Sequence, residues 1–406
     1  MKLIGIAAVA AALALPSLAL GEDTTYDETQ NWLAAWGQTQ KDMTDPNETA
    51  GTYVNSAGNA AANAQDPNAP EQGPYQLHQW PWSGDPDREP CDSSTPSVND
   101  CYDGEVEHVS FESTGGMTLD ANAWFPKSDA LKDDAGRVPG IVISSGFQGN
   151  QKMYYWAAQG LAEAGYLVFT YDVSGQGHSE GQQTGPAPDE LRDALDFFIA
   201  PERDWAGQLQ ADNIGIAGHS MGAGAVQEVG NDNRPEVKAI SAWSDLGASY
   251  TGNAPIQGQG ADYDAWITPP VRDDVGPDDP GKLDGFDSVR GRGVDVQEIV
   301  IESATHLAWS HVTWSYTSTW SEEIALFYAL AWFDKYLAND LARDGASATT
   351  RLLSNHESAE SPGHGLSRKY LSAYSIGGSY CRDQRDREIE CVTTTKKSKT
   401  KPPKQR

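Results

Sequence analysis

The chain has 406 residues, and its 38% hydrophobic and 21% charged positions are those of a globular protein. It carries 58 acidic against 29 basic side chains, a formal net charge of −29. A body this acidic repels polyphosphates and anionic lipid headgroups, which argues against nucleic-acid binding and against docking on anionic membranes.

The first twenty residues have the pattern of a secretory signal peptide. Lys2 precedes an apolar run from Leu3 to Leu15, and Pro16 and several small residues follow. The run is about 13 residues long, whereas a membrane span needs roughly 20. We therefore expect residues 1–21 to be a signal peptide, and the protein to be secreted without a membrane anchor.

Residues 22–104 predict an irregular N-terminal extension. The segment is rich in Asn, Gln, Ala, Gly, Asp and Pro and has little apolar periodicity. Its most apolar part, PYQLHQWPW at residues 74–82, has enough apolar area to pack on the main domain. The sequence does not indicate where it would pack.

From residue 105 the pattern predicts an α/β domain that continues to residue 345. Apolar runs bounded by turn residues alternate with helix-period segments, which is typical of a mostly parallel central sheet flanked by helices. The expected strands are 105–114, 119–126, 138–146, 166–172, 213–218, 237–243, 255–262 and 296–304. The expected helices are 153–165, 189–199 and 321–343.

Four cysteines lie near the two ends of the chain. We expect disulfides between Cys91 and Cys101 and between Cys381 and Cys391, because secretion implies an oxidising compartment and each pair closes a short polar loop. A zinc site is the weaker interpretation, since neither spacing fits a zinc knuckle. We predict a C-terminal extension with a disulfide over 346–391 and no metal or cofactor.

The last residues, 392–406, predict a basic disordered tail. The final eleven residues, KKSKTKPPKQR, contain six basic side chains and no acidic one. Such low-complexity composition does not bury enough apolar area to form a core.

The segment Gly218–Gly224, GHSMGAG, follows a predicted strand and opens a helix of small residues. A G-x-S-x-G pattern in that context predicts a sharp strand-to-helix turn that presents a serine, Ser220, above the sheet. Side chains at Gly218 and Gly222 would collide with neighbouring backbone in such a turn.

A serine hydroxyl becomes a useful nucleophile when a histidine within hydrogen-bond reach is oriented by a carboxylate. We expect His306 to be the base, because it directly follows the last strand pattern, with His311 as the alternative. Asp262, at the end of the strand before, is the expected acid. Asp245 lies one strand earlier and stays open as an alternative acid.

Acyl transfer also requires donors for the developing oxyanion, each worth about 3–4 kcal/mol. One predicted donor is the backbone N–H of Met221, directly after the nucleophile. The other is the backbone N–H of Phe147 in the loop GFQG, which follows a buried strand. This glycine-rich loop is no phosphate cradle, because it lacks the Gly-Lys-Ser/Thr ending.

These motifs resemble those of the α/β-hydrolase superfamily over residues 105–345. IAGHSMGAG resembles its nucleophile elbow, SSGFQGNQ its oxyanion loop, and YDVSGQGHSEG the loop after its fourth strand. Within it, the chain is most similar to secreted dienelactone-hydrolase-like and cutinase-like esterases. Ser174 stands where the family usually has arginine in the third motif. The resemblance implies the α/β-hydrolase fold and the chain order serine, acid, histidine.

Together these residues predict a secreted serine hydrolase that cleaves a small-molecule or polymeric carboxylic ester through an acyl-enzyme. A serine peptidase or amidase on the same fold is one alternative. The other is a non-catalytic binding protein with a hydrolase fold, which the aromatic segment HLAWSHVTWSYTSTW and the acidic surface could serve. The oligomeric state is not predicted.

Overall fold

The structure is a computed structural model. The residues that it describes are 75–76, 104–147, 149–181, 188–244, 246–247, 249–263, 284–310, 317–318, 320–359, 363–367, 372–377, 379–382 and 390–393. The predicted signal peptide, Cys91, Cys101 and most of the predicted N-terminal extension lie outside these residues.

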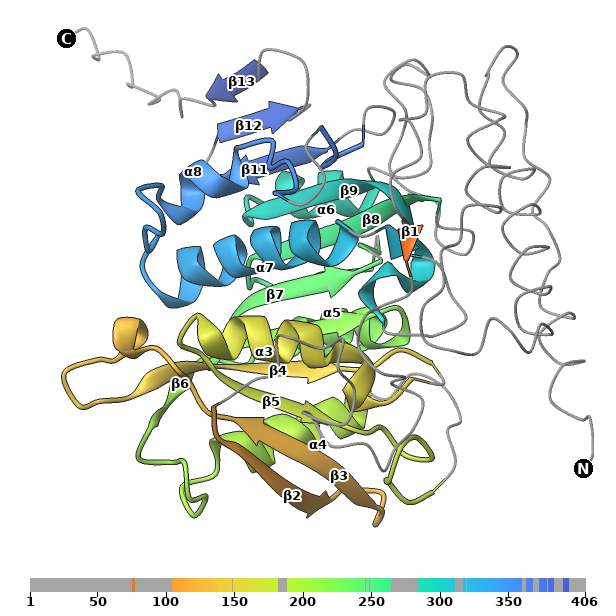
Figure 1. Ribbon diagram of the computed structural model, residues 1–406, viewed down its shortest axis with the longest axis vertical. Helices are drawn as coiled ribbons and strands as arrows, with labels where there is room; N and C mark the ends of the chain where they lie inside the picture. Colours follow the sequence, from red (N-terminus) through yellow and green to blue (C-terminus); the bar gives the residue numbers. More distant parts are fainter. Residues whose placement is uncertain are drawn as a thin grey trace, which may run out of the picture.

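One sheet forms the centre of the molecule (Figure 1). Its strands are β2 (Val106–Glu112), β3 (Thr118–Trp124), β4 (Val138–Ser144), β5 (Leu167–Tyr171), β6 (Leu209–His219), β7 (Val237–Trp243), β8 (Ile256–Tyr263), β9 (Val296–Thr305), β11 (Ala373–Ile376), β12 (Ser379–Arg382) and β13 (Glu390–Thr393). Their order in this 11-stranded sheet is β13-β12-β11-β9-β8-β7-β6-β4-β5-β3-β2. The six strands from β5 to β9 in that order are parallel to their neighbours. The strands at both edges pair antiparallel.

Helices cover both faces of the sheet. They are α3 (Tyr155–Glu163), α4 (Pro188–Ile199), α5 (Met221–Asn231), α6 (Asp284–Gly291), α7 (Ser321–Leu337) and α8 (Ala348–Leu352). Helices α3 and α7 pack on one face, and α4 and α5 pack on the other (Figure 1). Short 3-10 turns are η1 (Asp129–Leu131), η2 (Gln151–Tyr154) and η3 (His306–Trp309). Within the described part of the chain, no helix has the length and apolar character needed to cross a bilayer.

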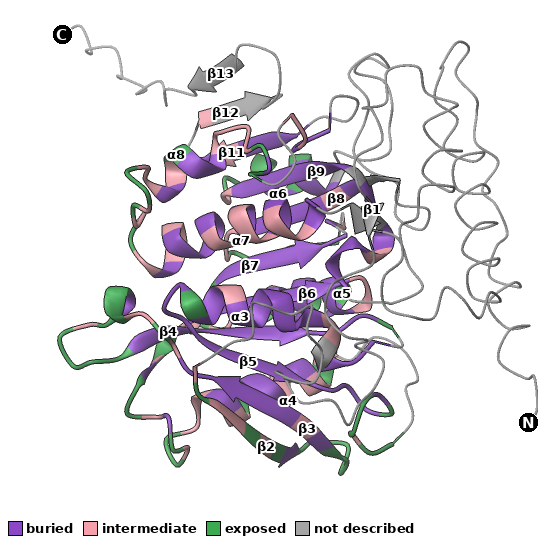
Figure 2. Cartoon of the chain, in the orientation of Figure 1, coloured by how far each residue is buried: buried purple, intermediate pink, exposed green. Residues whose placement is uncertain are grey.

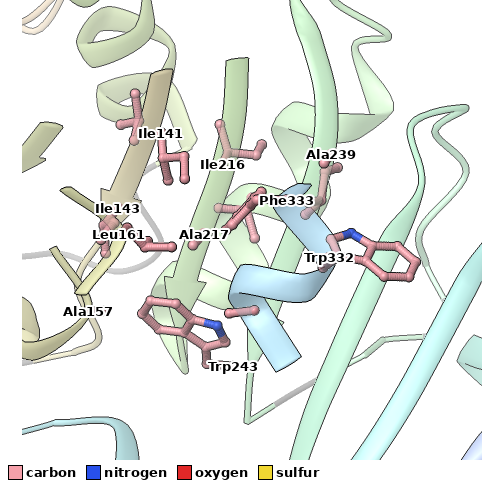
Figure 3. Close-up of a cluster of buried hydrophobic side chains, with 14 of the residues drawn as sticks. Ile141, Ile143, Ala157, Leu161, Ile216, Ala217, Ala239, Trp243, Trp332 and Phe333 are labelled. Atoms are coloured by element: carbon pink, nitrogen blue, oxygen red, sulfur yellow. The ribbon is translucent and has the colours of Figure 1, made fainter. Parts of the chain in front are cut away.

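Burial explains why the central strands have continuous apolar sequences. All residues of β4 and β5 are buried, because helices cover both of their faces (Figure 2). Between the sheet and helices α3 and α7, side chains such as Ile216, Trp243 and Phe333 form a buried hydrophobic cluster (Figure 3). The predicted strand and helix alternation is therefore confirmed as an α/β arrangement.

Helix α4 shows how a local pattern sets the packing. Its buried residues, Leu191, Ala194, Leu195 and Phe198, follow the spacing of one helix face. Asp189 and Glu190 lie in its first turn, where carboxylates interact favourably with the helix dipole. The helix therefore packs its apolar face inward and leaves Asp189 and Asp196 exposed to solvent.

Three buried glutamines bind the sheet to the helices above it. Gln257 on β8 donates to the side-chain oxygen of Gln297 on β9 at 2.7 Å and to the Tyr328 carbonyl of α7 at 3.0 Å. Gln259 donates to the Ala325 carbonyl of α7 at 3.0 Å, and Gln297 donates to a carbonyl of α8 at 2.9 Å. Buried amide groups need partners of this kind, because an unsatisfied one costs roughly 1–3 kcal/mol.

The C-terminal segment adds three strands to the central sheet. Strand β11 pairs antiparallel with β9, and β12 and β13 continue the same sheet. Strand β13 reaches Thr393, so the sheet extends two residues into the segment assigned to the tail. These strands have only four residues each, and their pairing with a distant strand leaves little local sequence signal.

Helix α7 ends earlier than its apolar pattern suggests. It stops at Leu337, whereas the sequence predicts a helix to Arg343. Asn339 and Asp340 have φ values of 54° and 61°, the left-handed conformation that ends helices and that Asn and Asp tolerate.

Two further pairings bear on the predicted segments. Strand β1 (Tyr75–Gln76) pairs with β10 (Thr317–Ser318), so part of the N-terminal segment lies beside the chain that follows η3. In the C-terminal hairpin, Cys381 on β12 lies opposite Cys391 on β13. Opposed Cα atoms in such a ladder are about 4.5–5.5 Å apart, within the roughly 4.4–6.8 Å of disulfides. Both predicted disulfides stay predictions.

A buried carboxylate joins α7 to the residues that follow it. Asp334 is fully buried and accepts hydrogen bonds from Arg343 at 2.6 and 2.9 Å, from Arg351 at 2.5 Å and from Tyr166 at 2.8 Å. Burial and the neighbouring Asp334 charge raise the pKa of Tyr166, so that its hydroxyl keeps its proton and donates. Removing the carboxylate charge would leave two largely buried guanidinium groups without their partner.

We expect Asp334→Asn to lower the free energy of unfolding by about 3 kcal/mol, because breaking a buried ion pair leaves uncompensated charge. The matched control is Asp287→Asn, which breaks the half-exposed pair with Arg290 and should cost less than about 1 kcal/mol. Urea unfolding followed by tryptophan fluorescence measures both. Equal losses in the two variants would contradict the role given to Asp334.

Candidate active site

Ser220 lies at a strained turn between β6 and α5. Its φ and ψ are 53° and −112°, a conformation that few residues other than glycine adopt. Its N–H donates to the Trp243 carbonyl of β7 at 3.0 Å, and its carbonyl accepts from Gly224 at 3.1 Å. The backbone on both sides is thus fixed by main-chain hydrogen bonds.

The glycines beside Ser220 lie where a side chain does not fit. A Cβ on Gly218 would come 2.4 Å from the Gly222 oxygen, and one on Gly222 would come 2.3 Å from the Ser144 oxygen at the end of β4. Real Cβ contacts are not this short. Backbone collisions at Gly218 and Gly222 are what the sequence pattern predicts.

His306 reaches Ser220 from the end of β9. The two residues are 86 positions apart, and Nε2 of His306 lies 2.8 Å from Oγ of Ser220. The imidazole is 6% exposed and belongs to η3, which begins directly after the strand. The alternative base, His311, lies outside the described residues.

A second serine contacts the other ring nitrogen of His306. Oγ of Ser244 lies 2.7 Å from Nδ1, and Ser244 is fully buried. Its φ is 75°, and its N–H donates to the Gln259 carbonyl at 2.6 Å. Ser244 is not among the site residues that the sequence predicts. Its position directly after the apolar run 237–243, at the carboxyl edge of the sheet, is the signal that could have pointed to it.

The two candidate acids lie on strands next to this contact. Asp262 is on β8, where the pairing with β9 shifts register between Ala261 and Tyr263. Tyr263 pairs with Thr305, the residue before His306, so the Asp262 backbone lies beside the strand end that carries the base. The side chain of Asp262 and the whole of Asp245 lie outside the described residues.

Both predicted oxyanion donors lie at the same edge of the sheet. Met221 is the first residue of α5, at the end where the helix dipole is positive. Phe147 follows β4, and its side chain is 56% exposed. Gly146, just before it, packs against the elbow, because a Cβ there would lie 3.0 Å from Nδ1 of His219.

The loop after β5 supports the oxyanion loop. Asp172 accepts the N–H of Gln151 at 2.6 Å and that of His178 at 3.0 Å, and Gln176 donates to the Gly146 carbonyl at 3.3 Å. Burial raises the pKa of Asp172 to about 6, against the effect of the two backbone donors. This loop is the YDVSGQGHSEG motif, so its role here is to hold neighbouring backbone.

Ser174 in the same loop contacts helix α4. Its N–H donates to Glu190 on α4 at 2.9 Å, and its hydroxyl bonds to the same carboxylate. The loop is therefore joined to α4 through a serine.

Among the described residues, three side chains that could act as metal ligands lie close together. Ligand atoms of Asp120, Asp172 and His178 lie within 4.8 Å of one another. Both oxygens of Asp172 already accept backbone N–H groups, from Gln151 and His178. The cluster therefore has a structural role in bracing the loop, and we assign it no ion.

Comparison with known proteins places these features in a family. A family model described as serine aminopeptidase, S33, matches residues 139–244, which include β4, the elbow and β7. The bis(hydroxyethyl) terephthalate hydrolase of Streptomyces coelicolor is 26% identical over 261 residues, covering 62% of this chain and 72% of that protein. The parallel strands, the strained Ser220 elbow and these matches agree. The chain is an α/β-hydrolase.

Two further relatives of the hydrolase match over shorter stretches. Cutinase 2 of Thermobifida cellulosilytica is 23% identical over 205 residues, covering 49% of this chain and 69% of the cutinase. A monoacylglycerol lipase of Mycolicibacterium smegmatis is 28% identical over 154 residues, covering 37% of this chain and 50% of the lipase. The predicted superfamily is thus confirmed, whereas the dienelactone-hydrolase-like subgroup stays a prediction.

We expect Gly222→Ala to destabilise the hydrolase by about 2 kcal/mol, because the added methyl group would push the elbow away from β4. Gly224→Ala is the matched control on the same helix, since a Cβ there meets nothing within 4 Å. It should raise the free energy of unfolding by up to about 1 kcal/mol through helix propensity. Thermal and urea unfolding measure both changes. Equal stability of the two variants would contradict the packing described here.

Proposed function

We propose that this hydrolase cleaves carboxylic esters with Ser220 as nucleophile and His306 as base. The observation that carries the proposal is the 2.8 Å contact between Oγ of Ser220 and Nε2 of His306 at a strained strand-to-helix turn. Relatives named as a terephthalate-ester hydrolase, a cutinase and a monoacylglycerol lipase support an ester substrate.

The contact suits a two-step acyl transfer. As Ser220 Oγ forms a bond to the acyl carbon, His306 Nε2 takes its proton and then gives it to the leaving alcohol. Water next loses a proton to His306 and attacks the acyl carbon. The bond from that carbon to Ser220 Oγ then breaks as His306 returns the proton to Oγ, which releases the acid and restores Ser220. No cofactor takes part in these steps.

The backbone N–H groups of Met221 and Phe147 would stabilise the oxyanion of each tetrahedral intermediate. Met221 suits this role because it is the first residue of α5, where the helix dipole favours negative charge. Phe147 suits it because the loop after β4 packs against the elbow through Gly146.

We assign the orienting carboxylate to Asp262. Its backbone lies at a register shift beside the strand end that leads into His306, and such irregularities often re-aim a side chain next to an active site. Asp245 is the alternative, because it follows Ser244, whose hydroxyl contacts Nδ1 of His306. Either carboxylate would orient the His306 ring through Nδ1, together with the Ser244 hydroxyl.

Peptide or amide cleavage is the second candidate function, because the matching family model is described as a serine aminopeptidase. We favour ester substrates, because the relatives are named as a terephthalate-ester hydrolase, a cutinase and a monoacylglycerol lipase. A non-catalytic binding role has less support, since the nucleophile and base side chains lie within hydrogen-bond distance. We also propose export through residues 1–21 and a small-molecule or polymeric ester as the substrate.

We expect Ser220→Ala to abolish turnover of short p-nitrophenyl esters and labelling by a fluorophosphonate probe, because the attacking oxygen is removed. Ser354→Ala is the control, since that hydroxyl donates to the Arg351 carbonyl at 2.7 Å just after α8 and should leave turnover unchanged. Initial rates and mass spectrometry of the labelled protein measure both. Undiminished turnover in Ser220→Ala would refute the assignment.

A matched pair of substrates separates the two functions. With the same acyl group, we expect the p-nitrophenyl ester to be hydrolysed and the p-nitroanilide to react far more slowly. Comparable kcat/KM values for the two would favour the peptidase or amidase instead.

We expect Asp262→Asn to lower kcat on the order of 10³- to 10⁴-fold, because the imidazole loses the charge that stabilises its protonated form. Asp245→Asn should lower kcat less than about tenfold, since it leaves the partner of His306 in place. Steady-state kinetics on one ester decides between them. The reverse order of losses would assign the acid to Asp245.

A further inference from the structure

The residue before the nucleophile, His219, is buried and hydrogen-bonded through both ring nitrogens. Nδ1 lies 3.0 Å from the hydroxyl of Tyr154, and Nε2 lies 2.8 Å from the carbonyl oxygen of His306. The Tyr154 hydroxyl also lies 2.9 Å from the N–H of Gly146. Tyr154 and His219 are 1% and 2% exposed.

These hydrogen bonds form a series that ends on the His306 carbonyl at one side and on the Gly146 N–H at the other, and these two groups fix the direction of every bond in it. A carbonyl oxygen only accepts, so Nε2 of His219 carries the proton and donates to His306. In the neutral ring Nδ1 is then an acceptor, and the Tyr154 hydroxyl donates to it. The Tyr154 oxygen in turn accepts from Gly146, whose N–H only donates.

Burial keeps both side chains in these protonation states. Desolvation, and then the charge of His306, lower the pKa of His219 well below its usual range. Desolvation raises the pKa of Tyr154, although the Gly146 N–H opposes this effect. The imidazole is therefore neutral and the phenol protonated at the pH values at which hydrolases work.

The chain of hydrogen bonds joins three separate loops of the site. Gly146 precedes Phe147 in the oxyanion loop and His219 precedes Ser220 in the elbow. His306 is the base. Gly146, Tyr154 and His219 are closely packed, because a Cβ on Gly146 would lie 3.0 Å from Nδ1 of His219 and 3.1 Å from the Tyr154 hydroxyl. The His219 ring also stacks on Trp309, with centroids 5.9 Å apart and planes at 28°.

We propose that Tyr154 and His219 are positioning residues, which hold the backbone of the oxyanion loop and of the base at a fixed separation before substrate binds. This inference rests on the proposed ester hydrolysis. Its physical reason is that acyl transfer requires the base and the oxyanion donors to be placed together, and displacements of about 1 Å can cost on the order of 100-fold in rate.

The first test is Tyr154→Phe, which removes one oxygen atom and keeps the ring. We expect kcat on a p-nitrophenyl ester to fall about tenfold, with KM within about twofold, because positioning acts in the transition state. Tyr250→Phe is the matched control, since its buried hydroxyl donates to the Ala254 carbonyl away from the site. It should lose comparable stability in urea and keep the wild-type kcat.

A pair of substitutions at the histidine gives a graded result. His219→Gln can still donate an N–H to the His306 carbonyl, whereas His219→Leu removes both hydrogen bonds. We expect the glutamine variant to retain several-fold more activity than the leucine variant at unchanged KM. If His219→Leu does not fold, Tyr154→Phe decides the question.

Nitrogen-15 NMR of the histidine-labelled full chain reads the hydrogen bonds without any substrate. We expect His219 to show a protonated Nε2 and an unprotonated Nδ1 from about pH 5 to pH 9, and Tyr154→Phe to shift the Nδ1 resonance. A His219 ring protonated on Nδ1, or one that titrates normally, would overturn the proposal.

Wild-type kcat in Tyr154→Phe, or a loss no larger than in Tyr250→Phe, would also overturn it. Failure of the proposed function looks different, because the wild-type protein itself would then hydrolyse no ester. In that case the variants are compared by their rates of fluorophosphonate labelling at Ser220. Equal rates in wild type and Tyr154→Phe would overturn the proposal.

Discussion

Ser220 holds a backbone conformation that costs on the order of 1–3 kcal/mol, and the surrounding main chain leaves it no room to relax. Gly218 and Gly222 bring the two arms of the elbow against each other and against the end of β4 at distances that exclude a methyl group. The strain is therefore sustained by the packed sheet. The hydroxyl is presented at one fixed position, and every other group of the site is placed relative to it.

The parallel sheet explains why distant residues meet at that position. Loops that follow neighbouring parallel strands emerge at the same edge, so β4, β6, β7 and β9 deliver Gly146, Ser220, Ser244 and His306 to one place. Each strand is anchored by a buried core between two helical layers. Precision at the site thus comes from rigid strand ends, although the functional groups themselves lie on turns.

Sequence alone could predict the elements whose signal is local. The elbow and its glycines, the apolar strands and the histidine after the last strand pattern each depend on a short run of residues, and Ser220 and His306 do lie together. Ser244 could not be selected in this way, because its contact with His306 depends on the order of strands in the sheet. Tyr154 and His219 resemble ordinary core residues until their partners across the sheet are known.

The C-terminal strands show the same limit in another form. Strands β11 to β13 are four residues each, and they are added to the sheet beside β9, some seventy positions earlier in the chain. Such pairings are stabilised by non-local contacts that leave no periodic pattern. The end of α7 is not predicted for a different reason, because the left-handed turn at Asn339 and Asp340 interrupts an apolar pattern that continues past it.

The glutamines of β8 and β9 have a consequence for how this protein can change over evolution. If the interface between α7 and the sheet were purely apolar, a shift of α7 by one helical turn would cost less free energy, because the hydrophobic effect is not directional. Amide hydrogens that must meet particular carbonyls of that helix remove this freedom, because a shifted helix would leave them facing hydrocarbon. Because the acceptors are main-chain carbonyls, a substitution of a side chain on α7 leaves these hydrogen-bond partners in place.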